Sequence, residues 1–252
     1  MIQVNDYDAM SKVAKDLIVS AVTSKQKINL GLATGSTPMG LYIDMVEDFK
    51  QNGTSYQHVT TFNLDEYVGL DESSLQSYRH FMNEHLFNHI NIPKNQTFIP
   101  SGKAANLEEE CKRYEDLIKQ NGGIDLQILG IGQNGHIGFN EPGSRFESRT
   151  HVVQLSDSTR QANSRYFQSL ADVPTHAITM GIQTILESKK IILLASGESK
   201  ANAVKRLLTE EPTEELPASA LKTHPDVVVI VDERALQHVN LNQVVHESYL
   251  FS

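Results

Sequence analysis

The chain has 252 residues, of which 22 are Lys or Arg and 31 are Asp or Glu, so its formal net charge is −9, and 39% of its residues are hydrophobic. This length and composition are typical of a globular chain with a full hydrophobic core, and they exclude an intrinsically disordered protein. Because the charge is negative and no run of basic residues occurs, nucleic acid is not expected as a partner. An anionic ligand must therefore be held by a few local cations.

The sequence carries no signal for a membrane or for export. No apolar run approaches the roughly 18 residues that a membrane helix needs, and the first residues lack the basic start and apolar centre of a signal peptide. Cys111 is the only cysteine, so an internal disulfide is excluded and no cysteine pair suggests zinc. We therefore expect a cytoplasmic protein with no membrane partner.

Short apolar runs alternate with longer segments of helical periodicity. The apolar runs predict strands, each buried on both faces, at 28–33, 59–64, 126–131, 151–155, 177–180, 190–195 and 227–231. The periodic segments predict helices at 10–22, 41–49, 78–87, 107–118 and 200–208. Asn106 and Glu109 predict a capped helix start, and Pro38 is expected in a first helical turn. The alternation predicts one α/β domain over residues 1–252, with a mostly parallel sheet and helices on both faces.

Ligands of such folds bind beyond the carboxyl ends of the strands. The first loop there, residues 33–38, passes from a predicted strand directly into a helix, and Gly35 permits its tight turn. Free N–H groups at the helix N-terminus and three neighbouring hydroxyls suit a phosphate group; the hydroxyls belong to Thr34, Ser36 and Thr37. The loop lacks the lysine of a P-loop and the spacing of a dinucleotide motif, so ATP and NAD are poorly supported. The alternative is an ordinary turn with a hydroxyl N-cap.

Two adjacent carboxylates, Asp65 and Glu66, follow the predicted strand 59–64. Neighbours along an extended chain point to opposite sides, so only one of them is expected to face a pocket. We predict that this residue is Asp65, the first one past the strand. The alternative is a solvated acidic turn that caps the next helix.

The segment 130–142 holds four glycines within the nine residues 130–138, a density that is costly in any regular element. It indicates backbone that approaches a ligand closely or adopts positive φ angles. His136 and Glu141 form a candidate acid/base pair, because a nearby carboxylate can fix the tautomer of a histidine that titrates near neutral pH. Asn134 can donate a hydrogen bond. The alternative is a glycine-rich loop with a structural histidine.

Two later segments supply cations. Arg165 follows a predicted strand and Lys200 lies where another strand passes into a helix. Arg can hold phosphate in a bidentate fork and Lys can do so as a point charge, although either alone is more commonly a solvated surface residue. His85 and His89 lie four residues apart, a spacing that metals use, but no acidic partner follows them as in zinc proteases. No metal site is predicted.

Together these motifs resemble the glucosamine-6-phosphate deaminase family of amino-sugar metabolism. The resemblance spans essentially the whole chain, in the segments LGLATGSTPMGLY, VTTFNLDEYVGL, GIGQNGHIGFNEPGS, STRQANSRYF and GESKANAV. It implies a Rossmann-like α/β fold and an enzyme that converts glucosamine 6-phosphate and water to fructose 6-phosphate and ammonia, without a metal or an organic cofactor. The expected ligand is a small sugar phosphate, and both a monomer and a homo-oligomer stay open.

The resemblance also implies roles for single residues. Asp65 matches the base that moves a proton between C2 and C1, His136 the acid/base that opens the sugar ring, and Glu141 the carboxylate that works with it. Asn134 stands where some members have Asp; a neutral amide can position the imidazole but does not stabilise imidazolium as an anion would. The phosphate ligands match Ser36, Thr37, Arg165 and Lys200.

Two alternatives remain open at this point. The 6-phosphogluconolactonases share the fold and a similar glycine-rich segment, but they are expected to lack the Phe-Asn-Glu-Pro that follows the histidine here at 139–142. A sugar-phosphate-sensing domain of a transcription regulator would keep the phosphate loop and lose the catalytic groups, whereas this chain has Asp65, His136 and Glu141.

Some family members are activated by N-acetylglucosamine 6-phosphate at a second site between subunits, where basic residues hold its phosphate. At the matching positions this chain has His151 and Val153. Valine carries no charge and a histidine is mostly neutral at pH 7. We therefore expect no activation by this compound.

Overall fold

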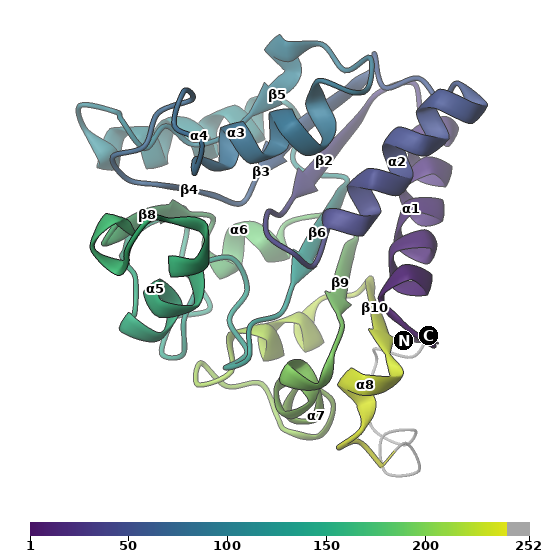
Figure 1. Cartoon of the computed structure of the whole chain (residues 1–252), viewed down its shortest axis with the longest axis vertical. Helices are drawn as coiled ribbons and strands as arrows, with labels where there is room; N and C mark the ends of the chain where they lie inside the picture. The colour runs from purple at the N-terminus through teal and green to yellow at the C-terminus, as the bar shows by residue number, and fades with distance from the viewer. Residues whose placement is uncertain (241–252) are drawn as a thin grey trace.

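Seven strands form the central sheet, and all neighbours in it are parallel (Figure 1). The structure is a computed structural model that describes residues 1–240, except for the side chain of Ser158. From edge to edge the strands are β1 (Ile2–Val4), β10 (Val227–Asp232), β9 (Ile191–Ala195), β6 (Leu126–Gly130), β2 (Ile28–Leu32), β3 (Val59–Asn63) and β5 (Thr97–Phe98). The chain runs outward from β2 on one side and from β6 on the other. The topological switch point therefore lies between these two strands.

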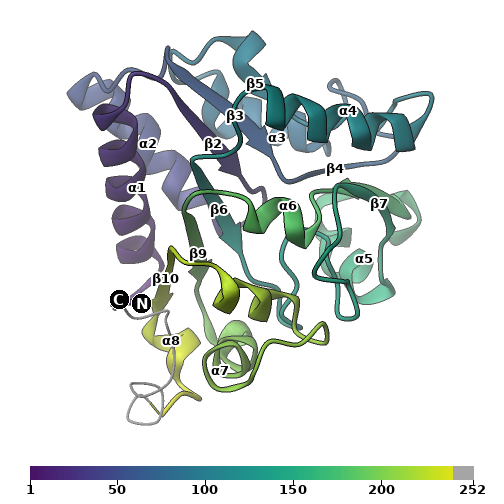
Figure 2. The same ribbon diagram turned by 180° about the vertical axis from the view of Figure 1, so that it is seen from behind.

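Helices cover both faces of the sheet, as the two opposite views show (Figures 1 and 2). One face carries α1 (Tyr7–Ser24), α2 (Met39–Asn52), α3 (Tyr78–Met82) and the π-helical turn η1 (Asn83–Phe87) that continues α3. The other carries α4 (Leu107–Gln120), α6 (Ile182–Leu186), α7 (Ala201–Thr209), η6 (Pro217–Thr223) and α8 (Glu233–Leu236). The remaining short helices are η2 (Lys94–Gln96), α5 (Asp157–Asn163), η3 (Ser164–Tyr166), η4 (Leu170–Asp172) and η5 (Glu198–Lys200).

Each face of the sheet has its own hydrophobic cluster, and successive strand residues join opposite clusters. In β9, Ile191 and Leu193 pack on the side of α4 and α7, while Ile192 and Leu194 pack on the side of α1 and α2. This two-sided burial explains why the central strands are continuous apolar runs rather than alternating ones. It confirms the predicted α/β fold with a parallel sheet covered on both faces.

A second sheet lies beside the first and corrects the sequence prediction. Three antiparallel strands form it, in the order β4 (Asp65–Tyr67), β8 (His176–Thr179) and β7 (His151–Gln154). The runs at 151–155 and 177–180 are strands as predicted, but they belong to this small sheet, and β7 is half-exposed rather than buried on both faces. Apolar content alone does not reveal which strands will pair, because that depends on tertiary neighbours.

Most predicted helices match the observed ones, with differences at the ends. The Asn106 side chain caps α4 as expected, accepting hydrogen bonds from the N–H groups of Glu108 and Glu109 at 3.1 and 3.2 Å. Pro38 is the N-cap residue of α2 rather than a residue of its first turn. Residues 241–252 of the predicted single domain lie outside the described residues. Within residues 1–240, no helix is long and apolar enough to span a membrane.

Candidate active site

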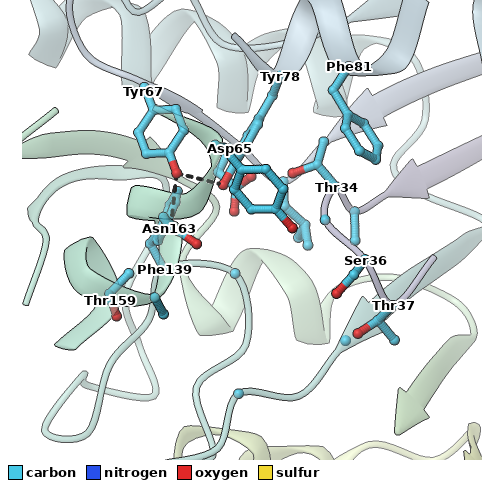
Figure 3. Close-up of a pocket in the computed structure, with 18 of the residues that line it drawn as sticks. Thr34, Ser36, Thr37, Asp65, Tyr67, Tyr78, Phe81, Phe139, Thr159 and Asn163 are labelled. Atoms are coloured by element: carbon cyan, nitrogen blue, oxygen red, sulfur yellow. Dashed lines mark hydrogen bonds between the residues drawn. The ribbon is translucent and has the colours of Figure 1, made fainter. Parts of the chain in front are cut away.

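A cavity of about 1020 Å³ opens at the carboxyl ends of the strands that flank the switch point (Figure 3). Loops after β2, β3, β6 and β9 line it together with the segment α5–η3. The sequence-predicted residues that line it are Thr34, Gly35, Ser36, Thr37, Asp65, Asn134, His136, Arg165 and Lys200. Glu141, the remaining one, lies behind the wall and contacts residues that do line the cavity. Segments far apart in the sequence thus meet at one place.

The loop between β2 and α2 forms one wall of the cavity. Gly35 has a φ of 96°, in the left-handed region that favours glycine, and a Cβ placed there would meet only open space. The hydroxyls of Ser36 and Thr37 lie along the same wall in Figure 3. No side chain caps α2, so the alternative of a hydroxyl N-cap is wrong here. Both hydroxyls and the helix N-terminus remain available to an anion.

Two cations lie together at this end of the cavity. Burial, with a smaller contribution from the neighbouring Arg165, lowers the pKa of the Lys200 ammonium below its usual value. Among residues 1–240 neither side chain has a carboxylate within ion-pair distance, and the Arg165 guanidinium lies 4.7 Å from the centre of the Tyr166 ring. A half-buried lysine beside an exposed arginine, with no counter-ion among the described residues, is an arrangement that suits an anion.

Asp232 fixes the loop that carries Lys200. Its buried carboxylate accepts hydrogen bonds from Ser196 Oγ at 2.5 Å and from Gly197 N at 3.0 Å, and it also caps α8. Gly197 has a φ of 89°, which only glycine adopts readily. The turn that leads into η5 and then α7 is therefore tied to the end of β10. Sequence reasoning missed Asp232 because it is a single carboxylate at the end of an apolar run.

The two neighbouring carboxylates of β4 take different directions, as predicted. Asp65 lines the cavity and is only 6% exposed. Glu66 points the other way and accepts hydrogen bonds from the N–H groups of Tyr67, Tyr78 and Arg79 at 2.9 to 3.0 Å. It therefore closes the start of α3. The capping alternative considered for the pair holds for Glu66, although that residue is buried rather than solvated.

Asp65 has the electrostatics of a proton-transfer group. Burial, with the neighbouring Glu66 carboxylate as a second cause, raises the pKa of Asp65 to about 8. Within residues 1–240 no hydrogen-bond donor contacts its carboxylate, whereas Glu66 has three. A cation bound next to Asp65 would favour its ionised form. A carboxyl with a pKa near the working pH suits a general base.

Glu141 lies behind the cavity wall and binds several polar side chains there. It accepts hydrogen bonds from Asn134 Nδ2 at 2.6 Å, Ser156 Oγ at 3.3 Å and the Thr159 hydroxyl. Its Oε2 lies 3.6 Å from His136 Nδ1. Burial opposes ionisation, but the contacts with His136, Thr159 and Asn134 outweigh it and lower the pKa of Glu141 to about 2. Glu141 therefore stays ionised and orients its neighbours.

His136 is held in one orientation by this arrangement. Its Nδ1 is buried on the side of Glu141, which leaves Nε2 as the ring nitrogen available to a ligand. The Asn134 side chain bridges the turn by donating to Glu141 and by accepting a hydrogen bond from the backbone N–H of His136 at 3.2 Å. Nδ1 has no hydrogen-bond partner within the described residues, and the Glu141 carboxylate 3.6 Å away favours a proton on this nitrogen, which leaves Nε2 to exchange a proton with a ligand.

The glycines of the segment 130–142 serve packing and turns. A Cβ on Gly132 would lie 2.3 Å from the His136 ring, so the imidazole packs directly on this backbone. Gly135 and Gly138 have φ angles of 86° and 58°, as expected for a loop with left-handed positions. The predicted positive φ angles are confirmed. At Gly132, however, the closely approaching group is the protein's own histidine rather than a ligand.

An aromatic group beside Asp65 in the cavity was not predicted from the sequence. Its members are Tyr67, Tyr78, Phe139 and Phe167. Tyr67 OH accepts a hydrogen bond from Asn163 Nδ2 at 2.9 Å and another from Tyr78 OH at 3.3 Å, and both are drawn in Figure 3. Phe139 and Phe167 pack against the Tyr67 ring at 5.7 Å between ring centres. In the sequence these aromatics are indistinguishable from core residues, because an aromatic side chain on a strand or helix most often belongs to the core.

The two histidines considered as metal ligands serve other contacts. His85 lines the cavity and packs edge-on against Phe81 at 4.5 Å, and His89 Nε2 hydrogen-bonds to the carbonyl of Glu84 at 2.7 Å. Across residues 1–240, no group of three or more His, Cys, Asp or Glu side chains is arranged to hold a metal ion.

The fold is that of a Rossmann-like α/β protein, with hydroxyls, two cations, a carboxyl and a histidine gathered around one cavity at the switch point. The profile of the family "Glucosamine-6-phosphate isomerases/6-phosphogluconolactonase" matches residues 6–235, and the chain belongs to this family. It is 56% identical over 239 residues to the glucosamine-6-phosphate deaminase of Geobacillus sp. (strain WCH70), covering 95% of each chain. It is 55% identical over 235 residues to that of Shouchella clausii (strain KSM-K16), covering 93% of this chain and 95% of the other.

Solved structures share the same fold. A structure of a monomeric glucosamine-6-phosphate deaminase superposes with a TM-score of 0.93 at 49% identity, covering 94% of this chain and 98% of that one. The 6-phosphogluconolactonase of Thermotoga maritima superposes with a TM-score of 0.72 at 23% identity, over 92% of this chain and 98% of that one. At that identity the second likeness shows a shared fold alone.

Proposed function

We propose that the chain is a glucosamine-6-phosphate deaminase, an enzyme that converts glucosamine 6-phosphate and water to fructose 6-phosphate and ammonia. The observation that carries this proposal is the convergence of a buried carboxyl, Asp65, with an oriented histidine, His136, and a two-cation anion site in one cavity. Relatives at 50% identity or more that bear the same name support it.

The first step assigned to the site is opening of the sugar ring. A proton must leave the C1 hydroxyl and another must reach the ring oxygen, and an imidazole can do both near neutral pH. His136 carries out this exchange through Nε2, while Glu141 holds its Nδ1 side. Because Glu141 is ionised, it also stabilises the imidazolium that forms when His136 takes up a proton. The Glu141 charge thus partly replaces the stabilisation of imidazolium that an aspartate at position 134 would give and that the neutral Asn134 amide does not.

The second step is proton transfer between two carbons. The Asp65 carboxylate removes the proton from C2 of the open-chain aldehyde while the C1 oxygen takes up a proton from solvent, which gives an enolamine with a hydroxyl at C1. Asp65 returns its proton to C1, and loss of one N–H proton to solvent leaves an imine at C2. Water then adds to C2 and ammonia leaves, which yields the ketose phosphate. The phosphate, held by Lys200, Arg165 and the loop after β2, keeps C1 and C2 against Asp65.

The experiment that tests the proposal is a coupled assay of both products from glucosamine 6-phosphate. Equimolar ammonia and fructose 6-phosphate support it. The nearest alternative, a 6-phosphogluconolactonase, would hydrolyse 6-phosphogluconolactone and release no ammonia, and a sugar-phosphate-sensing domain would bind the sugar phosphate without turnover. A panel that includes the galactosamine epimer establishes how strictly the 4-hydroxyl is read.

We further propose that the enzyme acts in the cytoplasm, in keeping with its single and buried cysteine, Cys111. A homo-oligomer and a monomer are distinguished by sedimentation of the purified chain. No organic cofactor or metal enters the proposed steps.

A separate prediction concerns His136. If it opens the ring, changing His136→Gln should slow turnover of the cyclic sugar by about 10²-fold or more. The defect should nearly vanish with the 4,5-dideoxy analogue of glucosamine 6-phosphate, which lacks both hydroxyls that close a furanose or pyranose ring and therefore stays in the open-chain form. Steady-state rates on the two substrates decide the point. An equal loss on both would assign His136 to a later step.

Another prediction concerns regulation. The nearby cation Arg149 is already paired with Glu187 and, at 3.4 Å, with Glu115, and His151 Nδ1 hydrogen-bonds to the Arg149 carbonyl at 2.8 Å. Val153 packs against the aromatic group. A second phosphate would find few free charged donors here, so we expect hyperbolic substrate curves and no effect of N-acetylglucosamine 6-phosphate. Sigmoidal curves that become hyperbolic when this compound is added at neutral pH would contradict the prediction.

A further inference from the structure

The hydroxyl of Tyr7 joins the phosphate loop to the first helix. Tyr7 is the first residue of α1, outside the cavity, and its position is set by the cap of that helix, where the Asp6 side chain accepts a hydrogen bond from Ala9 N at 2.8 Å. The Tyr7 hydroxyl donates to the carbonyl of Ser36 at 2.7 Å and accepts a hydrogen bond from Gly40 N at 2.7 Å. One hydroxyl thus spans both ends of the turn that leads into α2.

These contacts determine which backbone groups face the cavity. In a trans peptide the C=O and the following N–H point in opposite directions. Because the Ser36 carbonyl points at Tyr7, the Thr37 N–H points away from α1, on the side of the loop where Thr37 lines the cavity. Among residues 1–240, no group of the protein accepts a hydrogen bond from this N–H. It is therefore left for a ligand.

A second tyrosine acts in the same way at the other end of the loop. Tyr42 OH donates to the carbonyl of Ala33 at 2.5 Å from inside the core. Both carbonyls that flank the turn are consequently bonded on the protein side. Carbonyl oxygens, which would repel a phosphate, are held out of the cavity, and the N–H groups are presented to it.

The contact between α1 and α2 is close enough to make this bridge firm. A Cβ on Gly40 would lie 2.4 Å from Ser11 Oγ and 2.9 Å from Tyr7 Cε1, so only glycine fits at this crossing. Ser11 Oγ in turn donates to the Tyr7 carbonyl at 2.9 Å. The Tyr7 ring is therefore packed between the two helices and has little freedom to release the loop.

We propose that Tyr7 is a positioning residue for phosphate binding: it sets the conformation of the loop 34–37 so that the Thr37 N–H and the loop hydroxyls meet the substrate's phosphate. The proposal deepens the proposed function and rests on it for the identity of the substrate. Removing the hydroxyl leaves Gly40 N–H and the Ser36 carbonyl without their partner, so the Ser36–Thr37 peptide is free to turn. Ordering this loop when phosphate binds then costs free energy, so phosphate binds more weakly.

The test is the variant Tyr7→Phe, compared with wild type and with the control Tyr56→Phe. Tyr56 is a buried tyrosine of the same fold whose hydroxyl has no hydrogen-bond partner within residues 1–240. We expect Tyr7→Phe to raise KM for glucosamine 6-phosphate and Kd for inorganic phosphate by a similar factor, about 3- to 10-fold for one lost hydrogen-bond bridge. The kcat should stay within about twofold, because the groups that transfer protons are untouched. Tyr56→Phe should change neither constant.

Unchanged KM and phosphate Kd in folded Tyr7→Phe would overturn the proposal. So would a loss of kcat with unchanged phosphate Kd, because that pattern belongs to a general structural role. Calorimetric binding of inorganic phosphate needs no turnover, so it decides the role of Tyr7 even if wild type releases no ammonia. If wild type released no ammonia, the proposed function would be refuted. The role of Tyr7 in positioning the loop would then be judged from the phosphate Kd alone.

Discussion

Changing Asp65→Asn should lower turnover of glucosamine 6-phosphate by about 10²–10⁴-fold, the typical effect of removing a positioned general base. The amide keeps the shape of the side chain and cannot accept the proton from C2. The phosphate site lies on other loops, so inorganic phosphate should still bind with wild-type Kd. Turnover and phosphate binding are measured on the same preparation, which separates lost chemistry from lost folding.

Glu66→Gln is the matched control for this change. Its carboxylate faces the N-terminus of α3 and accepts backbone N–H groups. The substitution should therefore affect stability more than the chemical step, and the folded fraction should keep a kcat close to wild type. Near wild-type turnover in Asp65→Asn combined with a lost kcat in Glu66→Gln would mean that the wrong carboxylate has been assigned.

Removing either cation of the anion site should weaken substrate binding strongly. Lys200→Ala and Arg165→Ala each delete a charge-assisted contact of about 1.5–3 kcal/mol, which corresponds to a rise in KM of roughly 10- to 150-fold. The two effects should not add fully, since both side chains hold the same group and Lys200 is already perturbed by Arg165. Initial rates over a wide range of substrate concentration measure the change.

The control lies on α7, the helix that directly follows Lys200. Lys205 is an exposed residue of α7, and Lys205→Ala should leave KM unchanged.

Glucosamine without its phosphate should be a very poor substrate for wild type, and the Lys200 and Arg165 variants should lose little more activity on this sugar. Equal efficiency of wild type on the two sugars would refute the phosphate role of the loop after β2 and of both cations.

The main sheet was predictable because burial on both faces leaves a clear pattern. Strands such as β9 are apolar at every position, and the intervening helices are amphipathic. The sequence did not show that β7 and β8 form a second, antiparallel sheet, because these strands contain the same apolar residue types as the strands of the main sheet. The short edge strand β1 was missed as well, since three residues give too little pattern to distinguish a strand from a loop.

The placement of the candidate site residues around one cavity was predictable where they directly follow a strand or lie close together in the sequence. Asp65 and the hydroxyls at 34–37 directly follow strands, and the carboxyl ends of parallel strands meet at one edge. Glu141 follows His136 by only five residues, so the pairing was accessible from the sequence. Tyr7 and Asp232 were not, because they act from behind the loops through contacts between segments that are remote in the sequence.

The most direct test of the function is to follow ammonia and fructose 6-phosphate together during turnover of glucosamine 6-phosphate by wild type and by Asp65→Asn. We predict that wild type forms the two products in equal amounts and that Asp65→Asn forms neither at a comparable rate while still binding phosphate. Absence of ammonia with wild type, or hydrolysis of 6-phosphogluconolactone in its place, would contradict the deaminase function.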